Sequence, residues 1–179
     1  MRVGSTFAHC HEVLGVIFFM IQRRFITIVI FVVGLLWMGM RWTNIRVRPS
    51  QSLGIKNGRL APLTERPNGI CTYSDDDGRS MQPLMLEYPP QQAIELLKQV
   101  IRQMPRSRIV TSTDDYLHVE CRSLLCAFVD DVEFAIDEAG KRIHFRSASR
   151  VGYSDLGVNR KRMEEFLRRY EQLRERLPK

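Results

Sequence analysis

The sequence predicts an α+β protein in which an antiparallel β-sheet of three to four strands carries two amphipathic helices on one face and follows an N-terminal transmembrane helix. Three observations predict this fold. An uninterrupted apolar run occupies residues 25–40. Apolar side chains recur at helical spacing near residues 90–104 and again near residues 159–173. Between these two segments, apolar and polar residues alternate as in strands with one buried face. Helices that flank a meander of strands pack into two layers.

Composition limits the size of the domain and the class of its partners. The chain has 179 residues, a length that is enough for one domain with an appendage. Its net charge is +7 and its pI is about 9.6. Much of the positive charge lies in residues 160–176, where glutamates are interleaved with the arginines. A mixed pattern of this kind is typical of a solvated helix face, so no nucleic-acid partner is expected.

The N-terminal segment, residues 1–24, is unusual. It contains a short apolar stretch, and Met20 would serve as an alternative start that places a new N-terminus directly before the longer apolar run. We therefore consider residues 1–19 to be either part of the protein or a mis-assigned extension. The cluster His9-Cys10-His11 has metal-ligating side chains, but three such residues in a terminal segment are more often incidental.

Residues 25–42 are predicted to form a transmembrane anchor. Their apolar run is slightly short of the roughly 20 residues that span a bilayer, and Trp42 would extend it at the interface. A cleavable signal peptide is the alternative, but no A-x-A cleavage site follows. The pair Arg23-Arg24 directly before the helix suggests a cytoplasmic N-terminus. We expect a single-pass protein of the inner (cytoplasmic) membrane with its C-terminal domain on the periplasmic side.

The chain after the anchor divides into a linker, residues 43–70, and a globular α+β domain, residues 71–179. Prolines and glycines punctuate the linker, and its apolar residues show no sustained period. Within the domain, the acidic stretch Asp75-Asp76-Asp77 lacks the spacing of a calcium-binding loop and is expected to be a solvated turn. No residue pattern indicates a metal site, and no cofactor is predicted.

The centre of the domain is a predicted β-hairpin over residues 128–150, with Ala139-Gly140 in its turn. If Asp137 pairs with Arg142, then Phe134 faces Phe145, and apolar side chains meet along one face. A slip of one residue would set apolar against polar side chains throughout, so this register is favoured. It also pairs Glu133 with Arg146, as an exposed ion pair of little energetic weight.

Asp130 departs from this pattern because it lies on the apolar face, opposite Ser149. A buried carboxylate needs a partner, and the candidates nearest in sequence are Arg150 and Arg160, although Arg150 points the other way in a regular strand. Two interpretations stay open. One is a ligand pocket lined by Asp130, Ser147, Ser149, Asn159 and Arg160. The other is a structural network that ties the hairpin to the last helix, which is the commoner arrangement.

Other residues with reactive side chains are given structural roles. His118 falls on the polar face of its strand and is expected to be exposed. The last helix is predicted to begin after Gly157, with Asn159 as its N-cap. The chain has four cysteines and no C-x-x-C motif, so buried free thiols are favoured, while disulfides that involve Cys71, Cys121 or Cys126 stay open.

Two long motifs in this region, FVDDVEF and RSASRVGYSDLGVNRKR, resemble the family known as domain of unknown function 1499. The resemblance covers roughly residues 65–175 and extends to PNGI at residues 67–70, to Pro83-Leu84 and to the segment TSTDDYLHVE. Members of this family occur in bacteria and plastid-bearing organisms, often behind a membrane or export segment. The family has no established activity.

The resemblance implies a set of motif positions as candidate binding residues, without assigning them catalytic roles. These are Asp130, Asp131, Glu133, Arg146, Ser147, Ser149, Arg150, Asp155, Asn159 and Arg160. One segment departs from the family pattern, since many members have a Cys-Val-Ser-Ser stretch where this chain has Ile70-Cys71-Thr72-Tyr73.

The sequence favours a membrane-anchored protein whose extracytoplasmic domain binds a small ligand or partner protein through a polar patch of aspartate, arginine and serine. Two alternatives stay open: a structural or assembly factor without a ligand, and a hydrolase-like enzyme that uses Asp130 or Asp131 as general base. An enzyme is the least favoured of the three, because the sequence shows no recognisable set of nucleophile and base.

Overall fold

The computed structural model describes residues 4–49 and 53–177, with side chains from Phe19 onward. The chain forms two compact units, Met1–Trp42 and Thr43–Lys179, and each is described by itself. The first unit lies in a single long helix, α1 (Gly4–Arg46). The side chains of the cluster His9-Cys10-His11, and the start of the chain at residues 1–3, lie outside this description.

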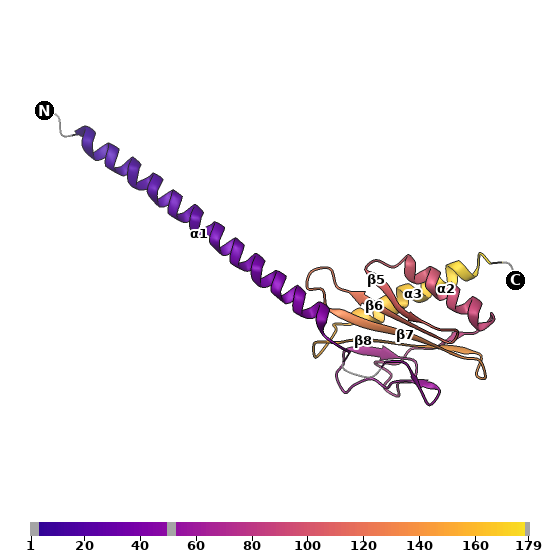
Figure 1. The fold of residues 1–179 in the computed structure, drawn as a ribbon. Helices are drawn as coiled ribbons and strands as arrows, with labels where there is room; N and C mark the ends of the chain where they lie inside the picture. The colour runs from indigo at the N-terminus through magenta and orange to yellow at the C-terminus, as the bar shows by residue number, and fades with distance from the viewer. Residues whose placement is uncertain (1–3, 50–52, 178–179) are drawn as a thin grey trace. The chain divides into compact units, whose positions relative to one another are not determined.

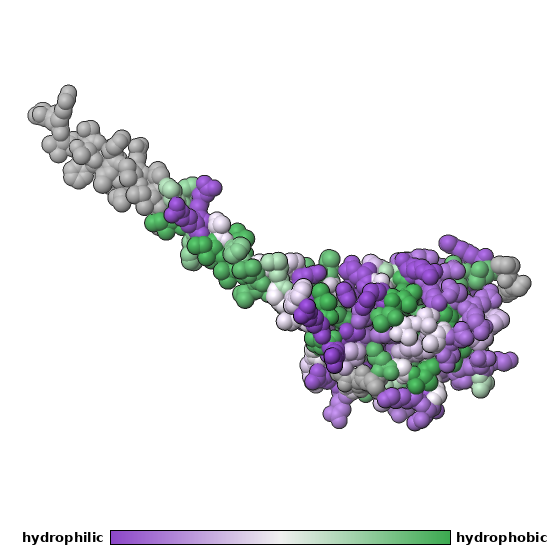
Figure 2. Space-filling model, viewed as in Figure 1, coloured by the Kyte–Doolittle hydropathy of each residue, from purple (hydrophilic) through white to green (hydrophobic). Residues whose placement is uncertain are grey.

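The helix α1 contains a stretch, Phe19–Arg46, that is long and apolar enough to cross a membrane. Its apolar side chains are exposed, and Figure 2 shows a mainly hydrophobic surface along the visible side of this stretch, with a hydrophilic patch close to its N-terminal end. A helix that is apolar all round has no polar face for water and requires an apolar environment. The length and composition of this helix are compatible with a membrane anchor or a signal sequence.

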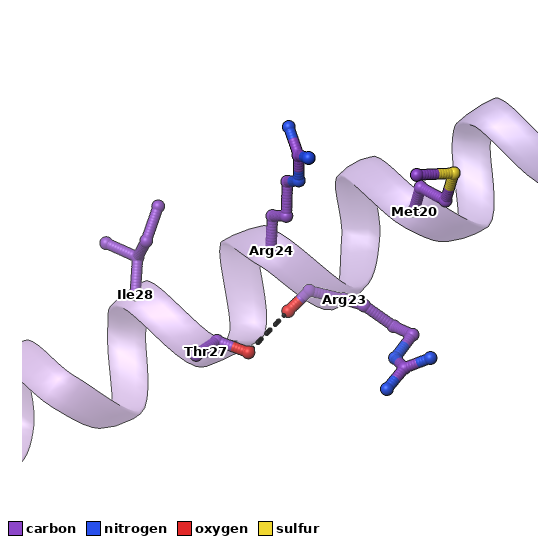
Figure 3. A pocket seen from close by; sticks show the side chains of 5 residues that line it. All are labelled: Met20, Arg23, Arg24, Thr27 and Ile28. Atoms are coloured by element: carbon purple, nitrogen blue, oxygen red, sulfur yellow. Dashed lines mark hydrogen bonds between the residues drawn. The ribbon is translucent and has the colours of Figure 1, made fainter.

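A shallow hollow of about 560 Å³ lies along α1 between Met20 and Ile28 (Figure 3). The side chains of Arg23 and Arg24 extend to different sides of the helix, and the Thr27 hydroxyl donates a 2.9 Å hydrogen bond to the Arg23 carbonyl oxygen. All the residues that line this hollow come from one helix. It therefore lacks a second wall that would enclose a ligand.

The second unit is built on an antiparallel sheet whose strands run in the order β3-β8-β7-β6-β5, with β4 also paired to β8 (Figure 1). The bounds are β3 (Gly69–Cys71), β4 (Leu84–Met85), β5 (Ser107–Ser112), β6 (Tyr116–Arg122), β7 (Val129–Asp137) and β8 (Arg142–Ser149). The predicted α+β class is confirmed. The predicted three to four strands are too few, because the sheet has six. The additional strands β3 and β4 are too short to show alternation in sequence.

The register of the central hairpin matches the prediction. Asp137 pairs with Arg142, Phe134 with Phe145, and Asp130 with Ser149. At the outer edge of β8, β3 approaches so closely that a Cβ atom on Gly69 would lie 2.8 Å from the Ser147 carbonyl oxygen. Only glycine fits this position without a shift of the backbone.

The helices α2 (Pro90–Arg102) and α3 (Val158–Arg174) cover one face of the sheet. Their apolar side chains pack against the even-numbered side of β7 and the odd-numbered sides of β6 and β8, and this contact forms the main core. Phe166 lies at its centre, with its ring centroid 4.7 Å from that of Phe134. The two predicted amphipathic helices and their apolar faces are thus confirmed.

The start of α3 differs from the prediction in one detail. Gly157, in the left-handed conformation with φ of 78°, is the N-cap residue, and Asn159 lies inside the first turn with a buried side chain. The Asp155 carboxylate accepts hydrogen bonds from the backbone N–H groups of Gly157 and Asn159, at 3.1 and 2.9 Å. Asp155 therefore satisfies the free donors of this helix end, which was the role expected of Asn159.

The opposite face of the sheet is covered by chain from the stretch expected to be a linker. Residues 43–70 include the two short strands β1 (Ile55–Lys56) and β2 (Arg59–Leu60), and β3 begins at Gly69. Leu60 packs on Tyr116 and Ala135 in a second, smaller apolar cluster. Because of this cover, side chains on both faces of β6, β7 and β8 are buried.

Candidate functional site

The predicted motif residues divide between the two faces of the sheet, because side chains alternate along each strand. One group faces α3, and the other faces the segment that follows α1. The first group contains Asp130, Ser147, Ser149 and Asn159. The second group contains Asp131, Glu133, Arg146 and Arg150. The structure thus shows two clusters where the sequence suggested one patch.

The helix-facing cluster joins the hairpin to the first turn of α3. Arg162 donates a 2.5 Å hydrogen bond to the Asp130 carboxylate and a 2.7 Å bond to Oδ1 of Asn159. The Ser147 hydroxyl donates to the same Asn159 oxygen at 2.6 Å. The Asn159 amide nitrogen donates to Oγ of Ser149 and to the Asn68 carbonyl oxygen. These contacts satisfy polar groups that would otherwise be costly to bury.

The partner of Asp130 is therefore Arg162, and the two arginines expected from the sequence bind elsewhere. Arg160 donates to the carbonyl oxygens of Gly78 and Ser80, at 2.9 and 3.0 Å. Arg150 lies on the other face of the sheet. Asp130 is 5% exposed, so its carboxylate is enclosed by the ion pair with Arg162. This geometry has the character of a structural network that fastens a helix to a sheet.

The second cluster, here called the arginine–carboxylate cluster, is organised around Arg150. Its guanidinium group donates to both oxygens of Asp131, at 2.9 and 2.7 Å, and to Glu120 at 2.8 Å. A fourth bond of 2.9 Å reaches the carbonyl oxygen of Val47. Paired contacts of this kind fix the plane of the guanidinium group as well as its position. The cluster thus ties three strands to the chain that follows α1.

His118 belongs to this cluster, and the expectation that it is exposed is wrong. The residue is 5% exposed, and its Nε2 lies 2.8 Å from Oδ1 of Asp131. The strand does alternate as predicted, with Tyr116, His118 and Glu120 on one side. That side is buried because the segment after α1 covers it, a contact that alternation within one strand does not reveal.

The predicted pair of Glu133 and Arg146 exists, with a 2.7 Å hydrogen bond, but its expected exposure is wrong. The side chains of Glu133 and Arg146 are 0% and 3% exposed. Glu133 accepts two further hydrogen bonds of 2.8 Å, from the Tyr116 hydroxyl and from the backbone N–H of Gly54. These three donors together satisfy the buried carboxylate.

The ionisation of these groups follows from their partners. Burial opposes the charge on Asp131, but the hydrogen bonds from Arg150 and His118 outweigh it and lower the pKa of this carboxyl group. Glu120 behaves alike: burial is outweighed by Arg108 and Arg150, so its pKa is also lowered. Burial and the neighbouring Glu133 carboxylate raise the pKa of Tyr116, which keeps this phenol protonated.

An open groove of about 540 Å³ lies beside the arginine–carboxylate cluster. The groove is lined by His118, Glu120 and Arg150. Val110 and Thr111 of β5, the strand that pairs with β6, also line it. Chain from Ile45 to Pro49 lines it as well and contributes Arg46 and Arg48. The groove therefore brings charged groups of the cluster to a surface that is accessible from outside.

Cysteines and metal ligands add little to this site. Cys71 and Cys121 are buried free thiols, and Cys126 is a free thiol that is partly buried. Burial raises the pKa of Cys71 and of Cys121, so both are poor nucleophiles at neutral pH. Among the described residues, no group of three or more histidine, cysteine, aspartate or glutamate side chains is arranged to hold a metal ion.

Several residues of the two clusters were not named as site candidates from the sequence. These are Asn68, Tyr116, His118, Glu120 and Arg162. The signal for Arg162 was its position three residues after Asn159, which places both on one helix face. The signal for Glu120 was its alternation with Tyr116 and His118, next to strands that carry Asp131 and Arg150.

Comparison with known proteins identifies a family but no characterised relative. Neither the curated proteins nor the solved structures contain a significant match to this chain. A family model described as a protein of unknown function (DUF1499) matches residues 59–170, which include the sheet from β3 to β8 and most of α3. This match spans more than half of the chain and confirms the resemblance carried by the hairpin motifs. The protein belongs to the DUF1499 family.

Proposed function

We propose that this chain is a membrane-anchored protein whose domain binds a small anionic ligand in the groove beside the arginine–carboxylate cluster. The observation that carries the proposal is the pairing of this groove with a buried, fully organised set of charged groups. A concave site with a few fixed polar groups is the usual form of a small-molecule site.

The floor of the groove is organised before any ligand arrives. Arg150 is held by Asp131, Glu120 and the Val47 carbonyl oxygen, and His118 is held by Asp131. Side chains whose positions are fixed in advance lose little conformational entropy when they bind. The cluster therefore supports binding of a ligand with a defined shape.

The charge of the groove favours an anion. Among the described residues that line it, three are arginines, Arg46, Arg48 and Arg150, and one is a carboxylate, Glu120. The Glu120 charge is already offset by Arg108 and Arg150, at 2.8 Å each. An anionic group such as a phosphate or carboxylate would meet an excess of positive charge.

The anchor part of the proposal assigns residues 25–42 to a single span of the inner membrane, with the domain on the periplasmic side. The support is the exposed apolar surface of the stretch and the arginine pair that precedes it. The binding function that we propose involves neither a nucleic acid nor a cofactor.

Ligand binding is tested with the full chain in detergent micelles. Inorganic phosphate, pyrophosphate, sulfate and citrate are titrated, and the melting temperature and heat of binding are measured. A ligand at 100 times its Kd stabilises the folded state by about 2.7 kcal/mol. Arg48→Gln is expected to reduce the affinity, whereas Arg142→Gln, an exposed arginine at the far end of β8, should leave it unchanged. Equal responses of both variants, or none of the parent chain, would refute the anionic groove.

A second candidate, a hydrolase-like enzyme, is favoured by the pair of His118 and Asp131. Nε2 of His118 lies 2.8 Å from Oδ1 of Asp131, and His118 lines the groove. An imidazole held in this way at a groove has the form of a general base. The test is hydrolysis of nitrophenyl esters and phosphate esters by the parent chain and His118→Ala. Activity that is equal in both would reject His118 as a base.

The structural alternative has support from the other cluster. Asp130, Asn159 and Arg162 bind one another in an enclosed network, which is what a scaffold role requires. For these residues we propose a structural role, and for the arginine–carboxylate cluster a role in binding.

A further inference from the structure

Two loops at one end of the sheet expose large apolar side chains. The first loop, residues 123–128, joins β6 to β7, and the second, residues 150–157, joins β8 to α3. Both leave the sheet at the same end, because Arg122 pairs with Val129 and the N–H of Arg150 binds the Val129 carbonyl oxygen at 3.0 Å (Figure 1). The exposed apolar residues are Leu124, Leu125, Phe128, Tyr153, Leu156 and Val158.

The first loop is a compact projection. Ser123 and Phe128 close it with two hydrogen bonds, at 2.9 Å between backbone groups and at 3.0 Å from the Phe128 N–H to the Ser123 hydroxyl. Leu124 and Leu125, inside this closed loop, are 66% and 68% exposed. An ordered loop that holds two neighbouring leucines in the solvent forgoes the free energy of burying them.

The second loop presents a leucine in an unfavourable backbone conformation. Leu156 is 87% exposed and has φ of 53°, in the left-handed region that bulky side chains rarely adopt. The loop is ordered by Asp155 and by the Asn68 side chain, which donates to the Gly152 carbonyl oxygen at 3.0 Å. Strain and exposure at one residue suggest that Leu156 is held there for a contact outside the domain.

The chain connects this end of the domain to the apolar helix. The Asn44 amide donates a 2.8 Å hydrogen bond to the Cys126 carbonyl oxygen in the first loop, and Val47 binds Arg150 at the start of the second. Asn44 follows Trp42 by two residues, and each residue spans at most about 3.6 Å. The first residues of the second unit, which follow the apolar stretch directly in sequence, therefore lie against both loops.

The charge at this end fits an anionic surface. Arg106 and Arg122 lie where β5 begins and β6 ends, and Arg46 and Arg48 lie in the chain after the apolar stretch. The acidic group of the second loop, Asp155, is occupied by the backbone donors of α3. Arginines next to exposed leucines are the composition of surfaces that bind anionic lipid headgroups and insert into the interface.

We propose that loops 123–128 and 150–157 dock this end of the domain on the anionic lipid surface of the membrane that holds the anchor. The proposal rests on the membrane anchor proposed above, and it does not require the groove to bind a ligand. Docking would place Leu124, Leu125 and Leu156 in the interface, and it would turn the opposite end of the sheet, at residues 138–141, away from the lipid.

The test uses the full chain in vesicles of phosphatidylcholine and phosphatidylglycerol that contain spin-labelled lipid. An environment-sensitive fluorophore is attached at Leu125→Cys or Leu156→Cys, and at Glu138→Cys in the far turn as the matched control. The four native cysteines are replaced by alanine. Docking predicts that the spin-labelled lipid quenches the fluorophore at positions 125 and 156 and does not quench it at position 138. Equal quenching at all three positions would overturn the docking proposal.

A second measurement avoids the cysteine replacements, in case they unfold the domain. Hydrogen exchange of the native chain is compared in vesicles with and without phosphatidylglycerol. Docking predicts slower exchange at residues 124–127 and 150–156 in the anionic vesicles, with residues 138–141 unchanged. Identical exchange in both vesicles would contradict the proposal. A chain that fails to float with the vesicles would overturn the anchor and docking together, whereas floating with unprotected loops would overturn docking alone.

Discussion

Arg150 binds Asp131 through two hydrogen bonds of 2.9 and 2.7 Å, although the two side chains are 7% and 4% exposed and lie on a face of the sheet that the sequence presents as polar. The pair is possible because each group has further partners: Glu120 and Val47 for the arginine, His118 for the aspartate. Charges that are buried together with their hydrogen-bond partners avoid much of the cost of leaving water.

Asp131→Asn should strongly destabilise the domain, because it leaves the buried Arg150 charge without its main partner. Removal of one member of a buried ion pair costs about 3–5 kcal/mol. The measurement is urea unfolding of residues 43–179, the unit that contains Asp131 with its described partners Arg150 and His118. Asp77→Asn, at an exposed position, is the control and should stay near the parent stability. Surface substitutions usually change the free energy of unfolding by less than about 1 kcal/mol. A loss that small for Asp131→Asn would show that the cluster does not stabilise the domain.

Asp130 and Arg162 should show strong energetic coupling. Single substitutions Asp130→Asn and Arg162→Gln each leave a charge in the cluster with Asn159, whereas the double variant leaves none. Contacting residues of this kind have interaction energies of about 0.5–3 kcal/mol in a double-mutant cycle. Additive effects of the two substitutions would contradict a structural network between β7 and α3.

The stability of the domain should fall as the pH drops below the ordinary range of carboxyl groups. Asp131 and Glu120 have lowered pKa values in the folded state. Groups with depressed pKa values contribute stability that is complete above their unfolded pKa, about 4, and is lost as the pH falls through the folded values. Unfolding by urea at a series of pH values from 7 to 3 measures this loss. In Asp131→Asn the decline should be shallower.

Cys71 and Cys121 should react slowly with thiol reagents in the folded protein, because burial raises the pKa of both. A thiolate is the reactive form, so few molecules carry one at neutral pH. Mass spectrometry after brief alkylation measures the modified fraction at each site, with urea-unfolded protein as the reference. Rapid labelling of both cysteines under native conditions would mean that the sheet opens readily.

The fold was predictable where one strand or helix carries its own pattern. Alternation over β7 and β8 fixed their register, and helical spacing identified α2 and α3. The burial of the polar face was not predictable in this way. A strand with polar residues on alternate positions looks the same whether that face meets water or a covering segment, and the segment from residue 43 onward shows no period of its own.

The sequence predicted which residues belong to the candidate site better than it predicted how they contact one another. The motif residues Asp131, Arg146 and Arg150 are in the arginine–carboxylate cluster, but Glu120 and His118 come from β6, outside the hairpin. Their contribution depends on the pairing of β6 with β7, which sets Glu120 opposite Asp131. Pairing between strands that are separated by a loop of irregular conformation is weakly encoded in the sequence.

The position of β8 in the sheet has a consequence for the order in which the chain folds. β8 is the last strand in sequence, yet it pairs with β3 and β4, whose residues lie 57 to 79 positions before their partners. Among the strands of the described chain, β8 is the one that pairs with β3 and β4, and Cys71 of β3 makes a further isolated bridge to Ser80. During synthesis, residues 69–85 must therefore wait until residue 149 has emerged. Contacts over such long sequence separations slow folding and prolong the exposure of unpaired strands.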